Sequence, residues 1–485
     1  MRFRVTMLNR KAVRCFALIA LSFFLTSSGY LSWLYHLMSM VSHGCSDLLS
    51  MSAGYAAQAA GILLLSTLIR KDAGLISGKL YGGMLGAFIA CLIPSMLSAG
   101  AAGTIVFGIL LNVCCGLIAG YYLYVLSLYA DASCQGRVFG YGYAAAALLT
   151  WLFSITGGGG FLRSGYSLLL YIPTAGACAY LGFLPTGNEA EDEVDADARK
   201  RSAKTARDTG KEGGKAAGQK TGRNAGIRPV NRLTSRSLAL IGCTLFLICL
   251  VKNLGFGFPS ADVHSGISIE LSRLVYAAGL IAAGHVNDRS RKWGAVCTLI
   301  ALITPFIMLT LEGESVPHII LWNLDYLIYG FFSVYRVLLF TDLAGSQDMP
   351  FLAPLGLAVG RMGEASGNLT ELLLRGHTTV LVLLAACLFA VTVVFFIRMY
   401  QDLYIPFAVQ KKTDREIFEH FAVRHDLSVR EKEVLRYLLD GYTNAEIAGK
   451  LFVSESTVKF HVHNLLQKTG CSGRAQLRSA YLEQK

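Results

Sequence analysis

The segment from Leu427 to Leu477 has the sequence LSVREKEVLRYLLDGYTNAEIAGKLFVSESTVKFHVHNLLQKTGCSGRAQL. It contains three short helical patterns, and each begins with a residue that can cap a helix. Ser428 and Glu431 have the spacing of a capping box, in which each side chain accepts a hydrogen bond from a free backbone N–H group of the other residue. Thr443 and Glu446 repeat this spacing. The short gap between the second and third patterns predicts a helix-turn-helix.

The third helical pattern starts after Ser454 and ends at Gly470. Apolar residues recur on one face of this pattern, and a polar stripe recurs on the opposite face. Short side chains near its N-terminus suit phosphate groups, and longer ones can reach base edges in DNA. The predicted core residues of the three helices are Val434, Leu435, Leu438, Ile447, Ala448, Leu451, Val458, Val462, Leu465 and Leu466. The predicted DNA contacts are Thr443, Asn444, Ser456, Thr457, Lys459, Phe460, His463 and Gln467.

The segments REKEVL, TNAEIA and STVKFHV resemble the LuxR-type (NarL/FixJ-like) DNA-binding domain, over the last ~60 residues of the chain. Lys459 is the strongest candidate for a DNA contact, whereas His463 stands where this family often has Lys or Arg. The residue pattern predicts a fourth helix over 474–482. The resemblance implies that this helix forms a homodimer, so that two domains bind half-sites about one DNA turn apart. The predicted dimer residues are Leu477, Ala480 and Tyr481. The alternative is a generic three-helix bundle with a solvated charged face.

The composition of the whole chain indicates a membrane protein. Of its 485 residues, 53% are hydrophobic and only 16% are charged, and the mean hydropathy is +0.48. A soluble chain of this length has about 25% charged residues. We therefore predict an all-α fold, in which a polytopic bundle of membrane helices precedes a soluble tail. The twelve cysteines lie mostly in apolar runs and form no CxxC pair, so we expect neither a metal nor a cofactor.

Twelve apolar segments approach the ~20 residues that cross a bilayer. They are 15–35, 48–69, 80–98, 103–128, 139–155, 166–184, 238–258, 267–286, 293–311, 318–340, 351–374 and 378–399. The net charge of +12 comes mostly from the N-terminus, a central hydrophilic stretch and the tail. This bias marks segments that stay in the cytoplasm, so both termini are expected on the cytoplasmic side of the cell membrane.

These patterns divide the chain into five predicted parts. They are a first membrane half over 1–185, a disordered charged cytoplasmic linker over 186–236, a second membrane half over 237–399, a connector over 400–426 and the DNA-binding domain over 427–485. The linker lacks large apolar residues and is predicted to be a flexible tether that also fixes the topology. Alternatively, its basic part binds DNA or anionic lipid.

A second resemblance lies after the eighth predicted span, where residues 284–292 have the sequence GHVNDRSRK. This segment resembles the G-xxx-D-R-x-G-R-K/R loop of the major facilitator superfamily, with Ser290 in place of the glycine. The matching residues are Gly284, Asp288, Arg289, Arg291 and Lys292. The equivalent loop of the first half, Arg70-Lys71-Asp72, is degenerate. Together with six spans on each side of a long loop, the motif implies a major-facilitator-like bundle.

Charged residues inside the predicted spans fall almost entirely in the second half. A charge at the bilayer centre costs at least ~2.5–3.5 kcal/mol, so these side chains should face inward and pair. Arg361 and Glu364 are three residues apart on one helix and can be neighbours. The candidate network is Glu270, Arg273, Asp325, Arg336, Arg361, Glu364 and Glu371, with Lys252 as a further buried charge. It either forms a ligand cavity or gate, or it only fixes helix packing.

Taken together, the sequence predicts a one-component transcriptional regulator in the cytoplasmic membrane. Its facilitator-like part would sense a small molecule, a proton or a partner protein, and its tail would bind double-stranded DNA. The alternatives are a major-facilitator transporter with a regulatory DNA-binding tail, and a mere membrane tether. An enzyme is least expected, since the sequence shows no nucleophile–base set, phosphate loop or metal-ligand spacing.

Overall fold

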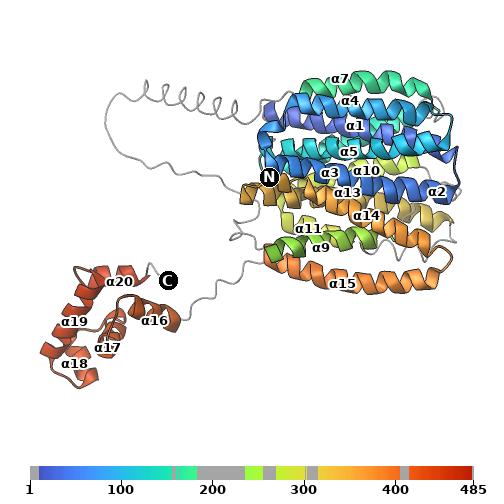
Figure 1. Cartoon of the computed structure of the whole chain (residues 1–485). Helices are drawn as coiled ribbons and strands as arrows, with labels where there is room; N and C mark the ends of the chain where they lie inside the picture. Colours follow the sequence, from blue (N-terminus) through green and yellow to red (C-terminus); the bar gives the residue numbers. More distant parts are fainter. Residues whose placement is uncertain are drawn as a thin grey trace, which may run out of the picture. The chain divides into compact units, whose positions relative to one another are not determined.

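The computed structural model describes residues 10–155, 160–162, 164–182, 235–254, 269–300, 302, 315–404 and 414–482. Every regular element in these ranges is a helix, as predicted. The chain divides into two compact units, Met1–Tyr404 and Ile405–Lys485 (Figure 1). The predicted linker over 186–236 lies outside the described residues except at its last two positions.

The described residues of the first half of the larger unit form six helical segments, in the predicted order. They are α1 (Arg10–Met38), α2 (His43–Asp47) with η1 (Leu48–Ala53) and α3 (Gly54–Lys71), α4 (Gly78–Leu97), α5 (Ala101–Tyr129), α6 (Gln135–Ile155) and α7 (Leu168–Gly182). Elements α2, η1 and α3 form one continuous helix of 29 residues, in which η1 has π-helical geometry.

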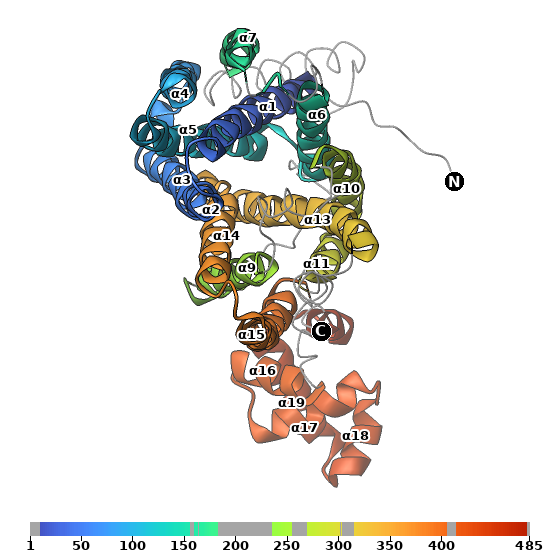
Figure 2. The same cartoon turned by 90° about the vertical axis from the view of Figure 1, so that its right-hand side faces the viewer.

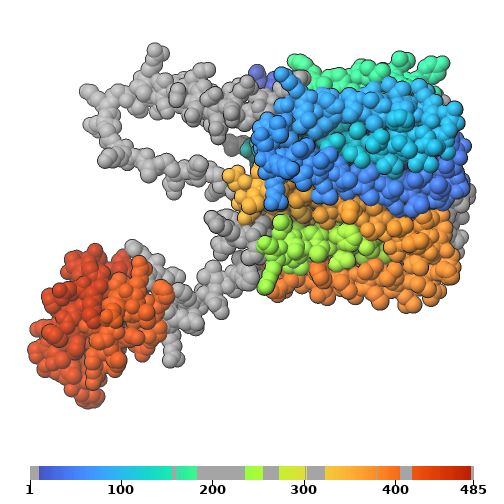
Figure 3. All heavy atoms as spheres, viewed as in Figure 1, coloured from blue at the N-terminus to red at the C-terminus, as the bar shows by residue number. Residues whose placement is uncertain are grey.

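The described residues of the second half form six further helices. They are α9 (Ser235–Lys252), α10 (Ile269–Arg289), α11 (Arg291–Ile300), α13 (Ser315–Gln347), α14 (Leu355–Leu373) and α15 (Thr378–Tyr404). Figure 2 looks along these helices and shows α1–α7 gathered in one group and α9–α15 in another. The two groups meet where α6 packs against α10 and α3 packs against α14. In the space-filling view they form two layers in contact (Figure 3).

Eight helices of the described residues are long and apolar enough to cross a membrane. The other four fall short for visible reasons. Helices α7 and α11 have only 15 and 10 residues in the described ranges. Helices α10 and α14 carry several charged side chains. The twelve helical segments follow the predicted order, whereas the number that spans a membrane stays a prediction.

Glycines allow a close contact between the two halves. A Cβ atom on Gly140 of α6 would lie 2.5 Å from the carbonyl oxygen of Leu280 in α10. A Cβ atom on Gly284 of α10 would lie 2.6 Å from the carbonyl oxygen of Gly136 in α6. A backbone carbonyl cannot turn aside as a flexible side chain can, so any larger residue would push α6 and α10 apart.

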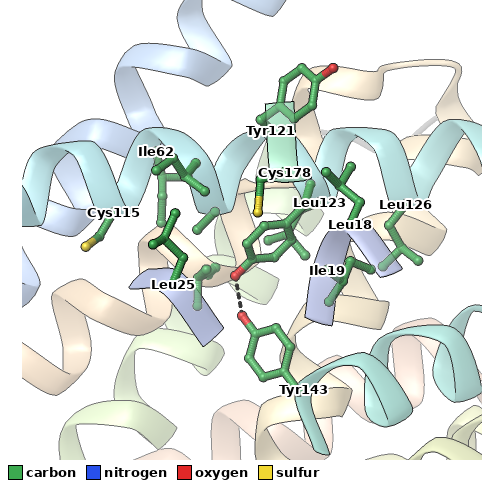
Figure 4. Close-up of a cluster of buried hydrophobic side chains, with 14 of the residues drawn as sticks. Leu18, Ile19, Leu25, Ile62, Cys115, Tyr121, Leu123, Leu126, Tyr143 and Cys178 are labelled. Atoms are coloured by element: carbon green, nitrogen blue, oxygen red, sulfur yellow. Dashed lines mark hydrogen bonds between the residues drawn. The ribbon is translucent and has the colours of Figure 1, made fainter. Parts of the chain in front are cut away.

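The core of the first half is apolar and extends into the second half. Leu18, Ile19 and Leu25 of α1 pack with Ile62 of α3 and Leu123 of α5 (Figure 4). The same cluster contains Ala277, Leu280 and Ala283 of α10 and Val334, Val337 and Leu338 of α13. Parts of α10 and α13 therefore share the core of the first half, while other buried residues of the second half form a separate apolar cluster.

The C-terminal unit contains five helices in its described residues. They are α16 (Asp414–Arg424), α17 (Val429–Leu439), α18 (Asn444–Leu451), α19 (Glu455–Thr469) and α20 (Arg474–Leu482). The structure differs here from the predicted connector over 400–426, because α15 continues to Tyr404 and α16 belongs to the folded unit. Phe418 and Phe421 of α16 are buried in its core, and the ring of Phe421 lies 5.5 Å from that of Tyr481 in α20. The apolar residues of α16 are thus buried against α20.

Candidate functional sites

Capping boxes start the first two helices of the predicted DNA-binding segment. Ser428 Oγ accepts a hydrogen bond from the backbone N–H of Glu431 at 3.3 Å, and Glu431 Oε2 accepts one from the N–H of Ser428 at 2.7 Å. Thr443 and Glu446 make the same exchange at 3.4 and 2.8 Å. Both predicted boxes are present, so local side chains satisfy N–H groups that the helices leave free.

The first box also holds the third helix in place. Lys468 of α19 donates a hydrogen bond to Glu431 Oε2 at 2.8 Å and another to the carbonyl of Asp426 at 2.9 Å. The Glu431 side chain is only 4% exposed. Burial by itself raises the pKa of Glu431, but the hydrogen bonds from Lys468 and Ser428 outweigh it and hold the pKa below its usual value. A charged Glu431 therefore ties α17 to α19.

Hydroxyl groups gather at the start of α19. Ser454 Oγ accepts a hydrogen bond from the N–H of Thr457 at 3.2 Å, and it lies 2.7 Å from the hydroxyl oxygens of both Ser456 and Thr457. Free N–H groups and the helix dipole at such an end favour a negatively charged group. This end of α19 suits the phosphate backbone of a nucleic acid.

Helix α19 presents the predicted face to solvent. Val458, Val462 and Leu465 are buried as predicted, and Leu466 is half-buried. Of the predicted DNA contacts on this helix, Ser456, Lys459, Phe460, His463 and Gln467 are exposed, while Thr457 is half-buried. The turn from α18 into α19 passes through Phe452, whose φ of 53° is left-handed and whose side chain is 95% exposed.

The remaining predicted DNA contacts lie at the start of α18. Thr443 is exposed, and Asn444 is half-buried. The side-chain oxygen of Asn444 accepts a hydrogen bond from Arg474 of α20, which also donates to the carbonyl of Tyr442 at 3.4 Å. Sequence reasoning missed Arg474, because 30 residues separate it from its partner and no local pattern links them.

The predicted dimer residues are placed differently from the expectation. Leu477 and Tyr481 are buried in the core of the C-terminal unit, and Ala480 is half-buried. They pack against the rest of the unit because α16 supplies two aromatic side chains on that side. The exposed residues of α20 include Ala475, Gln476, Arg478 and Ser479. A dimer through α20 stays a prediction.

The larger unit contains a cavity of about 190 Å³ between its two halves. The first half contributes Phe23, Thr26, Ser27, Tyr30, Leu31, Met51, Tyr55, Gln58, Ile62, Cys115, Gly116, Ala119, Tyr122, Tyr143, Ala147 and Thr150. The second half contributes Arg273, Tyr276, Tyr326, Tyr329, Arg336, Leu357 and Arg361. Seven of these residues are tyrosines, and all the charged ones are arginines.

Two of the arginines share one buried carboxylate. Arg336 Nη1 of α13 lies 2.5 Å from Glu364 Oε1, and Arg361 Nη1 of α14 lies 2.7 Å from Glu364 Oε2. The Glu364 side chain is 1% exposed. A Cβ atom on Gly360 would lie 2.9 Å from Arg336 Nη1, so this glycine makes room for the guanidinium group. The expected contact between Arg361 and Glu364 is present, and Arg336 completes a triad.

A second buried pair lies in the same half. Lys252 Nζ of α9 is 3.8 Å from Asp325 Oδ2 of α13 and 4.1 Å from the ring centre of Tyr329. Tyr329 also donates a hydrogen bond to Glu364 Oε1 at 3.4 Å, so this tyrosine contacts both Lys252 and Glu364. Glu371 is half-buried and does not line the cavity, and the side chain of Glu270 lies outside the described part of the chain.

The segment predicted as a loop over 284–292 is almost wholly helical. Gly284 and Asp288 lie within α10, and α11 begins at Arg291, so only Ser290 separates the two helices. Asp288 accepts hydrogen bonds from the N–H groups of Gly136 and Arg137 at 2.7 and 3.0 Å, which places a carboxylate at the start of α6. Arg289 and Lys292 are exposed.

Arg291 of the same segment also contacts both halves. Its Nε and Nη2 atoms bind the two oxygens of Asp342 in α13 at 2.7 and 3.2 Å, and Nη2 also donates to the carbonyl of Ala132 at 3.1 Å. Sequence reasoning missed Asp342, because its position near the end of a long apolar helix gives no sign of its partner. Together, Asp288 and Arg291 tie the two halves at this end.

Comparisons with known proteins agree with this geometry at the C-terminus. Residues 425–480 match the family of bacterial regulatory proteins described as the luxR family. Over 50 residues the chain is 48% identical to the spore germination protein GerE of Bacillus subtilis, a match that covers 10% of this chain and 68% of GerE. The chain belongs to the luxR family of bacterial regulatory proteins. Its capping boxes, its helix-turn-helix and the exposed face of α19 all lie within the matched residues.

Two further relatives are longer luxR-type proteins. The chain is 57% identical over 47 residues to the uncharacterized transcriptional regulatory protein YxjL of Bacillus subtilis, and 50% identical over 52 residues to the transcriptional regulatory protein DegU of Brevibacillus brevis. These matches cover 10% and 11% of this chain. The chain spans about a fifth of the length of each of these relatives.

The rest of this luxR-family chain has the fold of major facilitator transporters. The human organic anion transporter MFSD10 (TETRAN) superposes with a TM-score of 0.51 at 15% identity, over 81% of this chain and 99% of the transporter. A peptide transporter POT in complex with alafosfalin gives 0.50 at 13% identity, over 80% and 95% of the two chains. The predicted facilitator-like fold and LuxR-type tail are thus both confirmed.

The tyrosines of the cavity are the main group that sequence reasoning missed. The chain has 22 tyrosines, and those at the cavity come from six different helices. Within each apolar helix a tyrosine resembles any other core residue, because its hydroxyl adds little to the pattern. Only the folded bundle brings them to one place.

Proposed function

We propose that this luxR-family protein is a one-component transcriptional regulator anchored in the cytoplasmic membrane. One observation carries the proposal, namely that a single chain joins a luxR-family DNA-binding domain to a facilitator fold with a cavity between its halves. A ligand that fits one conformation of the halves better than another shifts the balance between them. Such a shift can reach the DNA-binding domain through the segment after α15.

The proposed topology places both termini in the cytoplasm. Twelve spans return the chain to the side on which it started, and the basic N-terminus and central stretch fit the cytoplasmic face. Reporter fusions at Lys485 test this arrangement. We expect activity from a cytoplasmic reporter and none from a reporter that requires export. The opposite pattern would overturn the topology and separate the tail from the chromosome.

The proposed DNA surface is the exposed face of α19 with the start of α18, used by two copies of the domain. Lys459 stands at its centre and is 64% exposed. Lys459→Ala in the full-length chain should weaken binding almost equally for all sequences and lower the salt slope by about one. Lys432→Ala is the matched control, because Lys432 lies on α17 and pairs with Glu419 of α16. The DNA sites for these binding assays must first be identified, by genome-wide capture of the intact protein on chromosomal DNA.

The result for Lys459 decides the assignment of the surface. An unchanged affinity and salt slope in Lys459→Ala, with normal stability, would show that the face of α19 does not contact DNA. Equal losses in Lys459→Ala and Lys432→Ala would instead indicate a diffuse basic surface without a defined recognition helix.

The second candidate function is a transporter of the major facilitator type whose tail is regulatory. The facilitator fold and the position of the cavity between its halves favour it. Purified protein in sealed vesicles separates the two functions. Concentrative uptake or counterflow of a bound ligand would support transport, whereas binding without flux, together with a change in DNA affinity, would support a sensor.

A further inference from the structure

We infer that the central cavity binds a small monoanionic carboxylate that carries a single aromatic ring. This inference rests on the proposed sensor function, because it names the ligand class of the same site. It is carried by three features of the cavity: the sign of its charges, its free hydrogen-bond donors, and the size and character of its walls.

The cavity is electropositive. The charged side chains that line it in the described residues are all arginines, and the carboxylate that binds two of them, Glu364, is not part of the lining. Glu364 sits behind Arg336 and Arg361 and binds one nitrogen of each. Arg336, Arg361 and Glu364 together carry one net positive charge at the wall, and Arg273 lines the cavity as a third arginine. A monoanion would neutralise the net charge of this triad, and the low dielectric of a buried site strengthens that attraction.

The same two arginines still have hydrogen bonds to give. The Nε atoms of Arg336 and Arg361 are buried and have no hydrogen-bond partner among the described residues. The Arg336 side chain is 4% exposed and therefore cannot turn to bulk water. A guanidinium group presents its donors in a planar fork that matches the two oxygens of a carboxylate. Buried donors without a partner at the wall of a cavity indicate where the acceptor of a ligand binds.

The other walls favour an aromatic ring. Tyr122 and Tyr143 belong to the first half, Tyr276 and Tyr329 belong to the second half, and the rings of the last two stack at 5.3 Å. Tyrosine rings pack well against a flat aromatic group. The volume of about 190 Å³ is slightly more than the roughly 150 Å³ cavity that holds one benzene molecule. One ring with a short acidic side chain fills such a space.

Such a ligand would act on both halves. Its carboxylate would bind arginines of α13 and α14, which belong to the second half, while its ring would contact tyrosines of α5 and α6 in the first half. Binding would therefore favour the conformation in which the two halves close around the cavity, which is the link that the sensor function requires.

The probes are benzoate, phenylacetate and 3-phenylpropionate, each compared with its neutral amide of nearly the same shape. Isothermal titration calorimetry on the purified full-length chain in detergent measures binding. We expect at least one acid to bind. Its amide should bind at least about thirtyfold more weakly, because it removes one partner of a buried charge pair. Acetate and propionate, which lack the ring, should also bind more weakly.

Two variants and one control test the site. Arg361→Gln should lose the preference for the acid over the amide, whereas Arg375→Gln should keep it, because Arg375 is 47% exposed and does not line the cavity. Arg361→Gln could fail to fold, and thermal unfolding checks this. Ala147→Leu fills part of the cavity without changing a charge, and it should lower the affinity for the acids even if Arg361→Gln cannot be purified.

The outcomes separate this inference from the sensor function. Equal affinity for acid and amide, normal binding by Arg361→Gln, or no binding of any acid at millimolar concentration would overturn the inference. If an acid binds but the DNA affinity of the full-length chain does not change, the ligand class stands and the sensor function fails. If another molecule changes the DNA affinity while no acid binds, the sensor function stands and the ligand class fails.

Discussion

The two units of this chain use charged side chains in opposite ways. In the facilitator unit, Arg336 and Glu364 form an ion pair whose side chains are 4% and 1% exposed. In the C-terminal unit, Lys459 and Glu455 form an ion pair at 3.0 Å whose side chains are 64% and 50% exposed. The buried pair has lost its water and depends on its partner, whereas the exposed pair can exchange its partner for water, salt or a phosphate group.

This difference separates structural charges from charges that are available for binding. A buried pair holds helices together and tunes a cavity, and removing one member leaves a charge without compensation. An exposed pair contributes little to stability, so its lysine is free to contact DNA. The effects predicted below should therefore decrease with the exposure of the pair, from the cavity to the surface of α19.

The largest effect is expected at Glu364. Glu364→Gln leaves two buried guanidinium groups without a counter-charge and should lower the free energy of unfolding of the facilitator unit by about 3–5 kcal/mol. Thermal and denaturant unfolding in detergent would measure it. Glu371→Gln, at a half-buried position of the same helix, is the matched control and should change stability much less. Equal stability of the two variants would mean that the triad is not a structural unit.

A smaller effect is expected where Asp288 joins the two halves. Asp288→Asn keeps the shape but removes the negative charge at the start of α6 and the ion pair with Arg137 at 3.0 Å. We expect a loss of about 1–3 kcal/mol in the same unfolding assay. Asp72→Asn, at the exposed equivalent position of the first half, should be nearly silent. A larger effect at Asp72 than at Asp288 would mean that the first-half segment, and not residues 284–292, joins the two halves.

The third prediction concerns Glu431 and acid. Because its pKa is lower in the folded state than its usual value of about 4.3, its contribution to stability is complete above that pH. The contribution is lost as the pH falls through the folded-state value. Glu431→Gln should cost the fragment 405–485 about 1 kcal/mol at neutral pH and should flatten its loss of stability below pH ~4.3. Parallel pH curves for the two proteins would contradict this role.

The smallest effect on stability is expected at Glu455. Glu455→Gln removes an exposed pair within α19 and should change the free energy of unfolding by no more than about 0.5 kcal/mol. Its effect on DNA should be opposite in direction to that of Lys459→Ala, because a negative charge near phosphate disappears. Equilibrium titration of DNA at two salt concentrations measures it. A loss of more than about 1 kcal/mol in stability would break the proposed relation between exposure and effect.

The accuracy of the sequence predictions follows the range of the interactions. Ser428, Thr443 and Ser454 were placed correctly, because a cap involves residues three positions apart. Arg361 and Glu364 were paired correctly for the same reason. Leu477 and Tyr481 were assigned to a dimer surface but are buried, because the aromatic residues of α16 that cover them lie more than 50 residues away. The partner of Arg291, Asp342, was missed because it lies 51 residues away. Arg336 and Glu364 were both placed in the predicted network, but sequence spacing did not pair them.

The sequence alone determined the helices, their order, the luxR-type tail and the half of the bundle that carries the charges. These follow from periodicity, capping and hydropathy, which act over one or two turns of a helix. Only the tertiary structure decided that seven tyrosines from both halves meet three arginines at one cavity, and that Glu364 lies behind the arginines and not in the wall. The physical reason is that burial and pairing depend on helices far apart in the chain, whose contacts no local pattern records.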